Sequence, residues 1–179
     1  MRDARSLFLA ANGLSPDRDT HTNWWNCRFG PLRLVFYNFA WRRRAIRHHD
    51  LHHIITGYRC TLAGEIQTAA WEFAAGRFPH WGATAFCLPL VLLGTVWQPK
   101  KTYAAFARGR RSRSLYGVPI TERLLDSNVA VLRRRCLPQR ESSGSATDKL
   151  AFGLLVAQAA TIVLGPLLVV ALVATTLSA

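Results

Sequence analysis

Four of the six histidines of this 179-residue chain lie within one six-residue segment, "HHDLHH". On an α-helix, residues four positions apart lie on nearly the same face, so the segment contains two imidazole pairs. The pairs are His48 with His52 and His49 with His53. Asp50 adjoins His49 and precedes His53 by three positions, which favours the second pair. Two imidazoles beside a carboxylate can bind one divalent metal ion. The alternative is a polar helix surface that faces water or anionic lipid, and the spacing alone leaves both open.

Two glutamates further along the chain could complete such a site. Glu65 lies twelve residues after His53, beyond a helix break that we expect at Gly57. Glu72 follows Glu65 by seven residues, on the same face of the next helix. Both acids lie in the otherwise apolar stretch "AGEIQTAAWEFAAG", where a carboxylate needs a metal ion or an arginine as its partner. Glu65 therefore joins the candidate site if the second helix folds back antiparallel to the first.

The elements expected to position these residues are helices. No glycine or proline interrupts residues 32–53, which we predict to form one long helix. A second helix is predicted from about Thr61 to Ala75, and a third from about Thr121 to Cys136. The apolar segment 80–97 contains an internal proline, and it indicates either a buried core helix or a helix that dips into a membrane.

The segment "HDLHH", residues 49–53, followed by eleven residues and Glu65, resembles the HDxxH-x11-E signature of the ubiquinone (coenzyme Q) biosynthesis Coq-four family. Neighbouring residues agree, because "HDLHHIITGY", the "GE" at 64–65 and the "WE" at 71–72 lie where the pattern of that family places them. The resemblance is strong over about residues 45–75 and extends more loosely through "AFARGRRSRSLY". The short tryptophan-rich region before the motif and the charge-free C-terminal tail depart from the family.

The resemblance implies an all-α fold, a single helical domain with a metal site between two helices. By matching position, the metal ligands and catalytic residues are His49, Asp50, His53 and Glu65. The match assigns no ligand role to His48, His52 or Glu72, which we expect beside the site or on the surface. The implied cofactor is one divalent metal ion, and a mixed nitrogen and oxygen ligand set suits zinc, iron or manganese.

The same resemblance implies a substrate and a reaction. The substrate is a polyprenylated hydroxybenzoate lipid, and the reaction is its metal-dependent oxidative decarboxylation at the membrane surface during coenzyme Q synthesis. A bound ion would polarise an oxygen of the ring substituents as carbon dioxide leaves. The alternative implied by the family is a non-catalytic lipid-binding scaffold that organises the quinone-biosynthesis enzymes. Those enzymes are expected partners in either case.

Lys and Arg outnumber Asp and Glu by 23 to 10, so the formal charge is +13 and anionic partners are favoured. The segment "KKTYAAFARGRRSRSLY" interleaves cations with aromatic side chains, a pattern that RNA-binding proteins also use. Because the chain also carries a predicted membrane segment, we favour anionic lipid headgroups over nucleic acid. Four scattered cysteines without a CxxC pair indicate reduced thiols in a cytosolic compartment.

Residues 150–177 form a run of 28 residues without a charge, after a polar stretch rich in serine. About 20 apolar residues suffice to cross a bilayer, so this run is long enough for a single-pass anchor. Basic residues precede the run and none follows it, which orients the soluble part toward the cytoplasm. We therefore expect a helical metal-binding domain over residues 1–137, a linker over 138–149 and a transmembrane helix over 150–177. The oligomeric state stays open, with a homo-oligomer as one candidate.

Overall fold

The computed structural model describes residues 1–15, 22–29, 32–76, 78–139 and 144–177 and is mostly helical. Its helices are α1 (Arg2–Ala11), α2 (Ala40–Thr56), α3 (Leu62–Ala75), α4 (Trp81–Trp97), α5 (Pro99–Gly109), α6 (Glu122–Leu125), α7 (Val129–Cys136) and α8 (Ala146–Leu177). Two strands, β1 (Trp24–Phe29) and β2 (Leu32–Tyr37), form an antiparallel hairpin.

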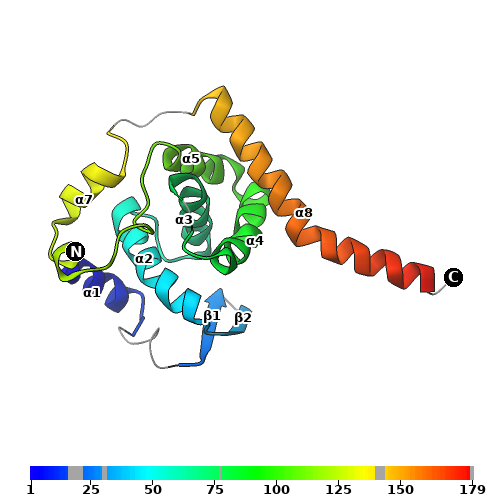
Figure 1. The fold of residues 1–179 in the computed structure, drawn as a ribbon, viewed down its shortest axis with the longest axis horizontal. Helices are drawn as coiled ribbons and strands as arrows, with labels where there is room; N and C mark the ends of the chain where they lie inside the picture. The colour runs from blue at the N-terminus through cyan, green and yellow to red at the C-terminus, as the bar shows by residue number, and fades with distance from the viewer. Residues whose placement is uncertain (16–21, 30–31, 77, 140–143, 178–179) are drawn as a thin grey trace.

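Helix α3 lies at the centre of the molecule, with α2, α4 and α5 packed around it (Figure 1). Its residues Ala69, Ala70 and Trp71 are fully buried in a cluster that also contains residues of α4, α5 and α8. Small residues let these helices approach closely, and Gly109 of α5 lies against the backbone of Trp71. The indole N–H of Trp71 donates to Ser112 Oγ at 3.0 Å, so the polar atom of this buried ring is satisfied.

The prediction of one helix over residues 32–53 is wrong at its beginning, because residues 32–37 form strand β2. Trp25 of β1 pairs with Phe36 of β2, and their ring centroids lie 5.5 Å apart. Aromatic and β-branched side chains pack well across paired strands, and this cross-strand contact outweighs the helical pattern. Asn38 separates the hairpin from α2, and its side-chain N–H donates to the carbonyl of Thr22 at 2.9 Å. The fold is therefore mostly helical rather than all-α.

Two shorter helices, α6 and α7, replace the single helix predicted over residues 121–136. The side-chain oxygen of Asn128 accepts a hydrogen bond from the backbone N–H of Ala130 at 2.8 Å and so caps the start of α7. Arg133 of α7 donates to the carbonyls of Ile54 and Ile55. This contact fixes α7 against the end of α2, the helix that carries the histidines.

Helix α8 projects away from the other helices at its C-terminal end, while its first turns pack against α4 and α5 (Figure 1). Leu155 and Ala159 are buried in the core cluster, and Asp148 accepts a hydrogen bond from Arg111 at 2.6 Å. In the described part of the chain, one helix is long and apolar enough to cross a membrane, Ala146–Pro166. The division into domain, linker and anchor stays a prediction.

The close contact between α3 and α5 generates a stability prediction. A Cβ atom at Gly109 would collide with the carbonyl oxygen of Trp71 and would lie 2.8 Å from Ala74 Cβ. We expect Gly109→Ala to lower the free energy of unfolding by about 1–3 kcal/mol, the range found for overpacked cores. Denaturant unfolding of the detergent-solubilised chain, followed by tryptophan fluorescence, measures it. The control is Gly153→Ala, at a position with open space around it, and equal stability of the two variants would contradict the prediction.

Candidate metal centre

The turn between α2 and α3 brings the histidines of α2 next to the first turn of α3. Gly57 ends α2 in the left-handed conformation, with φ of 80°, which confirms the predicted break. Thr61 begins α3, and its hydroxyl oxygen accepts a hydrogen bond from the N–H of Gly64 at 3.3 Å. Gly64 lies so close to the backbone of Arg59 that a side chain would not fit there. As a result, Glu65 faces the last turns of α2.

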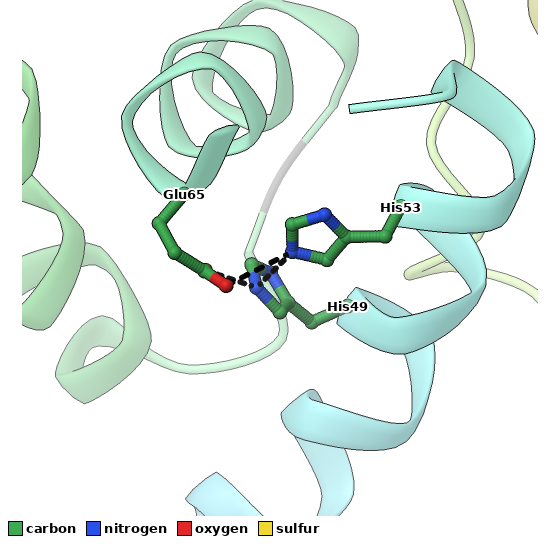
Figure 2. A group of neighbouring side chains, drawn as sticks. All are labelled: His49, His53 and Glu65. Atoms are coloured by element: carbon green, nitrogen blue, oxygen red, sulfur yellow. Dashed lines mark hydrogen bonds and ion pairs between the residues drawn. The ribbon is translucent and has the colours of Figure 1, made fainter. Parts of the chain in front are cut away.

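Three side chains converge between α2 and α3 (Figure 2). His49 Nε2 lies 2.9 Å from Glu65 Oε2 and 3.0 Å from His53 Nε2. His53 Nε2 lies 3.4 Å from the other carboxylate oxygen of Glu65. One ligand atom from each of the three residues lies within 4.8 Å of the others. The cluster could therefore hold a metal ion.

The other ring nitrogen of each of these imidazoles has its own hydrogen-bond acceptor. His53 Nδ1 lies 2.9 Å from the carbonyl oxygen of Tyr58, and His49 Nδ1 lies 3.0 Å from Glu72 Oε1. Carbonyl and carboxylate oxygens accept and do not donate, so both Nδ1 atoms carry hydrogens. In neutral rings both Nε2 atoms then present lone pairs to the cluster. Histidine ligands of metal ions are oriented by outer hydrogen bonds of this kind.

When no metal ion is bound, a proton on His49 supplies the positive charge that attracts the carboxylate of Glu65. Burial disfavours a charged ring, but the carboxylates of Glu72 and Glu65 outweigh it and raise the pKa of His49 well above its ordinary value. Burial likewise opposes the charge on Glu65, but hydrogen bonds from His49 and His53 lower the pKa of this carboxyl below its usual range. An imidazolium N–H on His49 therefore lies between Glu65 and His53, where a metal ion would lie.

The donor set and its spacing fit a divalent ion. Two imidazole nitrogens and a carboxylate oxygen are a mixed set that suits zinc, iron or manganese. Ligands about 2.1 Å from a tetrahedral ion lie roughly 3.4 Å from one another. The separations between the three ligand groups are 2.9, 3.0 and 3.4 Å, so a small widening would accommodate the ion.

Glu72 is fully buried and accepts three hydrogen bonds on Oε1. The donors are His49 Nδ1 at 3.0 Å, His52 Nδ1 at 2.7 Å and the Tyr116 hydroxyl at 2.9 Å. The backbone N–H of Leu115 donates to His52 Nε2 at 2.8 Å, so His52 is neutral, and burial lowers its pKa. Burial opposes the charge on Glu72, but the two histidines outweigh it and lower the pKa of Glu72 to about 2. Its partners are thus histidines and a tyrosine, and not an arginine.

Asp50 lies apart from the other three predicted ligands. Its side chain is buried, and Oδ2 lies 3.6 Å from a guanidinium nitrogen of Arg5 on α1. His48 also lies outside the cluster, because its Nε2 donates to the carbonyl of Val118 at 2.8 Å. Of the four predicted ligands, the structure brings together His49, His53 and Glu65.

Sequence reasoning assigned no ligand role to the residues that orient the imidazoles. A signal for Glu72 was present, because its spacing of seven residues from Glu65 places both acids on one helical face. His52 lies one turn away from His49 and shares Glu72 as its acceptor. No sequence signal identified Tyr116, which lies in the segment between α5 and α6.

The part of the chain that contains this cluster matches a known family. Residues 37–138 match the family model of the coenzyme Q (ubiquinone) biosynthesis protein Coq4. The match includes helices α2 to α7 and covers more than half of the chain. No curated protein and no solved structure matches the chain.

The convergence of three ligand groups predicts one bound divalent ion per chain. We expect His53→Ala and Glu65→Gln to lose that ion, because each removes a ligand atom from the cluster. His48→Ala is the matched control, since it removes a histidine of the same helix whose ring bonds to Val118 outside the cluster. Inductively coupled plasma mass spectrometry of the purified variants measures the metal content. Equal loss in all three variants would contradict the assignment.

The raised pKa of His49 predicts that metal binding releases a proton. An ion and a proton compete for Nε2, so the affinity for Zn²⁺ should fall as the pH falls and should rise with pH up to the raised pKa of His49. Calorimetric titration in buffers with different ionisation enthalpies measures the release, which we expect to be about one proton per ion near pH 7. Binding without proton release would contradict the prediction.

The variant Glu72→Gln tests the cause of that proton release. It removes the charge that raises the pKa of His49 most strongly and weakens the acceptor that orients the ring. Fewer protons should be released, and the affinity should fall by about 10- to 100-fold, as for other partners of metal-bound histidines. The same titration measures both quantities.

Proposed function

The chain belongs to the coenzyme Q (ubiquinone) biosynthesis protein Coq4 family, and from this membership we propose that it catalyses the decarboxylation of a polyprenylated hydroxybenzoate ring. Membership implies a role in ubiquinone biosynthesis. The observation that carries the proposed reaction is the convergence of His49, His53 and Glu65 on a point that could hold a metal ion. The oxidative form of the reaction releases the ring carboxyl group as carbon dioxide and puts a hydroxyl group in its place. Dioxygen is the oxidant and supplies the hydroxyl oxygen, and a two-electron reductant converts its second oxygen atom to water.

The chemistry and position of the cluster support this proposal. A zinc, iron or manganese ion held there would polarise a carboxylate or phenol oxygen of the ring and stabilise the charge that builds up as carbon dioxide leaves. Glu72 and the carbonyl of Tyr58 hold the two imidazoles in position. The side chains of His49 and Glu65 are 16% and 18% exposed, so the cluster lies at the edge of the core and not in its centre.

Asp50 stays in the proposed set on the strength of the family motif alone. Its carboxylate pairs with Arg5 at 3.6 Å, so ligation would require Asp50 to leave this partner. Asp50→Asn therefore distinguishes the two roles. Loss of metal with retained stability favours a ligand, whereas loss of stability with retained metal favours a contact between α1 and α2.

The substrate and partners that we propose are those of a membrane protein. A polyprenyl chain resides in a bilayer, and α8 contains the candidate membrane-crossing segment Ala146–Pro166. The positive charge of the chain favours an anionic membrane surface, with the helical domain on the cytoplasmic side. Other quinone-biosynthesis enzymes are the proposed protein partners, in accordance with the family role.

The alternative function is a lipid-binding scaffold with a structural ion. The observation that favours it is the burial of His53, whose side chain is 1% exposed and whose Nδ1 donates to the carbonyl of Tyr58. A structural ion would also be held by a buried, oriented ligand of this kind.

A turnover assay separates the two functions. The full chain in detergent, loaded with Zn²⁺, Fe²⁺ or Mn²⁺ in turn, is supplied with a prenylated hydroxybenzoate under air, and the products are followed by mass spectrometry. We expect His49→Ala and Glu65→Gln to lower turnover by more than about 100-fold, since even orienting partners of metal ligands contribute about 10- to 100-fold. His48→Ala should keep the wild-type rate.

Two results would contradict catalysis by a metal ion in this cluster. One is a wild-type chain that binds metal and prenylated lipid but gives no product with any of the three ions. The other is full turnover in the metal-free Glu65→Gln variant. The first result would favour the scaffold.

A further inference from the structure

Helix α4 carries an exposed apolar stripe along its whole length. The 17 residues of α4 include no charged side chain. Residues at intervals of four, from one end to the other, are exposed: Trp81, Ala85, Pro89, Leu93 and Trp97. Trp81 is 77% exposed, and Val96, next to the last of them, is 84% exposed. Such side chains on a surface helix would normally be polar.

The opposite face of α4 is equally apolar and forms part of the core. Cys87, Leu88 and Val91 are buried in the cluster centred on α3. The helix is therefore apolar on both sides, whereas the described part of the chain covers its inner side and, on the outer side, leaves the stripe exposed. An exposed apolar face of this size marks a surface that contacts another protein or a membrane.

Helix α8 is fixed to the same layer of the structure. Leu155 and Ala159 are buried in the cluster that contains the inner face of α4, and Val163 packs against that cluster. The candidate membrane-crossing segment Ala146–Pro166 therefore shares a packed cluster with α4. Insertion of α8 into a bilayer would bring α4 to the membrane with it.

We propose that α4 is a bilayer-contacting surface whose exposed stripe lies in one leaflet of a phospholipid membrane beside α8. Tryptophans prefer the interface between headgroups and acyl chains, and Trp81 and Trp97 occupy the two ends of the stripe. Lys100 and Lys101, in the first turn of α5 and three and four residues after Trp97, are exposed and suit anionic headgroups. A membrane explains these cations beside the stripe, whereas a second copy of this cationic chain would bring like charges together.

The contact places the metal-site helix one layer from the membrane. Gly94 of α4 packs against Ile66, the residue after Glu65. The side chain of Gln98 donates to the carbonyl of Ala63 at 2.9 Å, which ties the C-terminal end of α4 to the first turn of α3. The bilayer surface is inferred from α4 and α8 alone and holds whichever reaction the site performs.

Quenching by brominated lipid tests the proposal on the full chain. The protein is reconstituted into vesicles of phosphatidylcholine and phosphatidylglycerol, with brominated or ordinary acyl chains. The wild-type tryptophan emission should be quenched by brominated chains, and the double variant Trp81→Phe, Trp97→Phe should lose most of that quenching. In this double-variant background, Leu93→Trp should restore quenching. Leu7→Trp, at an exposed position of α1, should not.

Two outcomes would overturn the proposal. If the double variant keeps the wild-type quenching and Leu93→Trp adds none, the stripe does not contact lipid. If the tryptophan of Leu93→Trp is not quenched and Leu93→Asp lowers the mass of the particle in analytical ultracentrifugation, a second copy of the chain covers the stripe. Circular dichroism of each variant checks that the helices are retained.

Discussion

The site depends on one buried carboxylate. Glu72 is removed from water on the central helix, and its Oε1 gathers donors from two other parts of the chain, the rings of α2 and the hydroxyl of Tyr116. A buried charge without partners would be very costly, so these donors must stay in place. Glu72 accepts a hydrogen bond from Nδ1 of His49, and the Nε2 atom of that ring therefore faces Glu65. Glu72 thus orients a ligand of the cluster although it is not itself one of the three clustered residues.

The packing around α3 connects the metal cluster to the other helices. Gly109 and Gly94 let α5 and α4 lie close to the central helix, and the turn at Gly57 returns the chain so that α3 faces the histidines of α2. The same helix thus presents its carboxylates to α2 and its apolar side to α4. As α4 and α8 share one core cluster, the site, the core and the apolar surface are parts of one packed unit.

Much of the local structure could be predicted from the sequence, because it depends on neighbours along the chain. The helix break at Gly57, the helix that carries Glu65, and the shared face of His49 and His53 follow from backbone preference and helical periodicity. The hairpin could not be predicted in this way. Its strand at residues 32–37 has a pattern compatible with a helix, and the pairing of Trp25 with Phe36 decides its conformation.

The sequence by itself determined which residue types could bind a metal ion, the face on which two of them lie, and the family to which the chain belongs. Only the tertiary structure decided that Asp50 lies beside Arg5, and that Glu72, His52 and Tyr116 share one hydrogen-bonded group. The physical reason is the range of the interactions. Periodicity fixes the direction of a side chain around its own helix. The hydrogen-bond partner and the protonation state of that side chain depend on which distant segment packs against it.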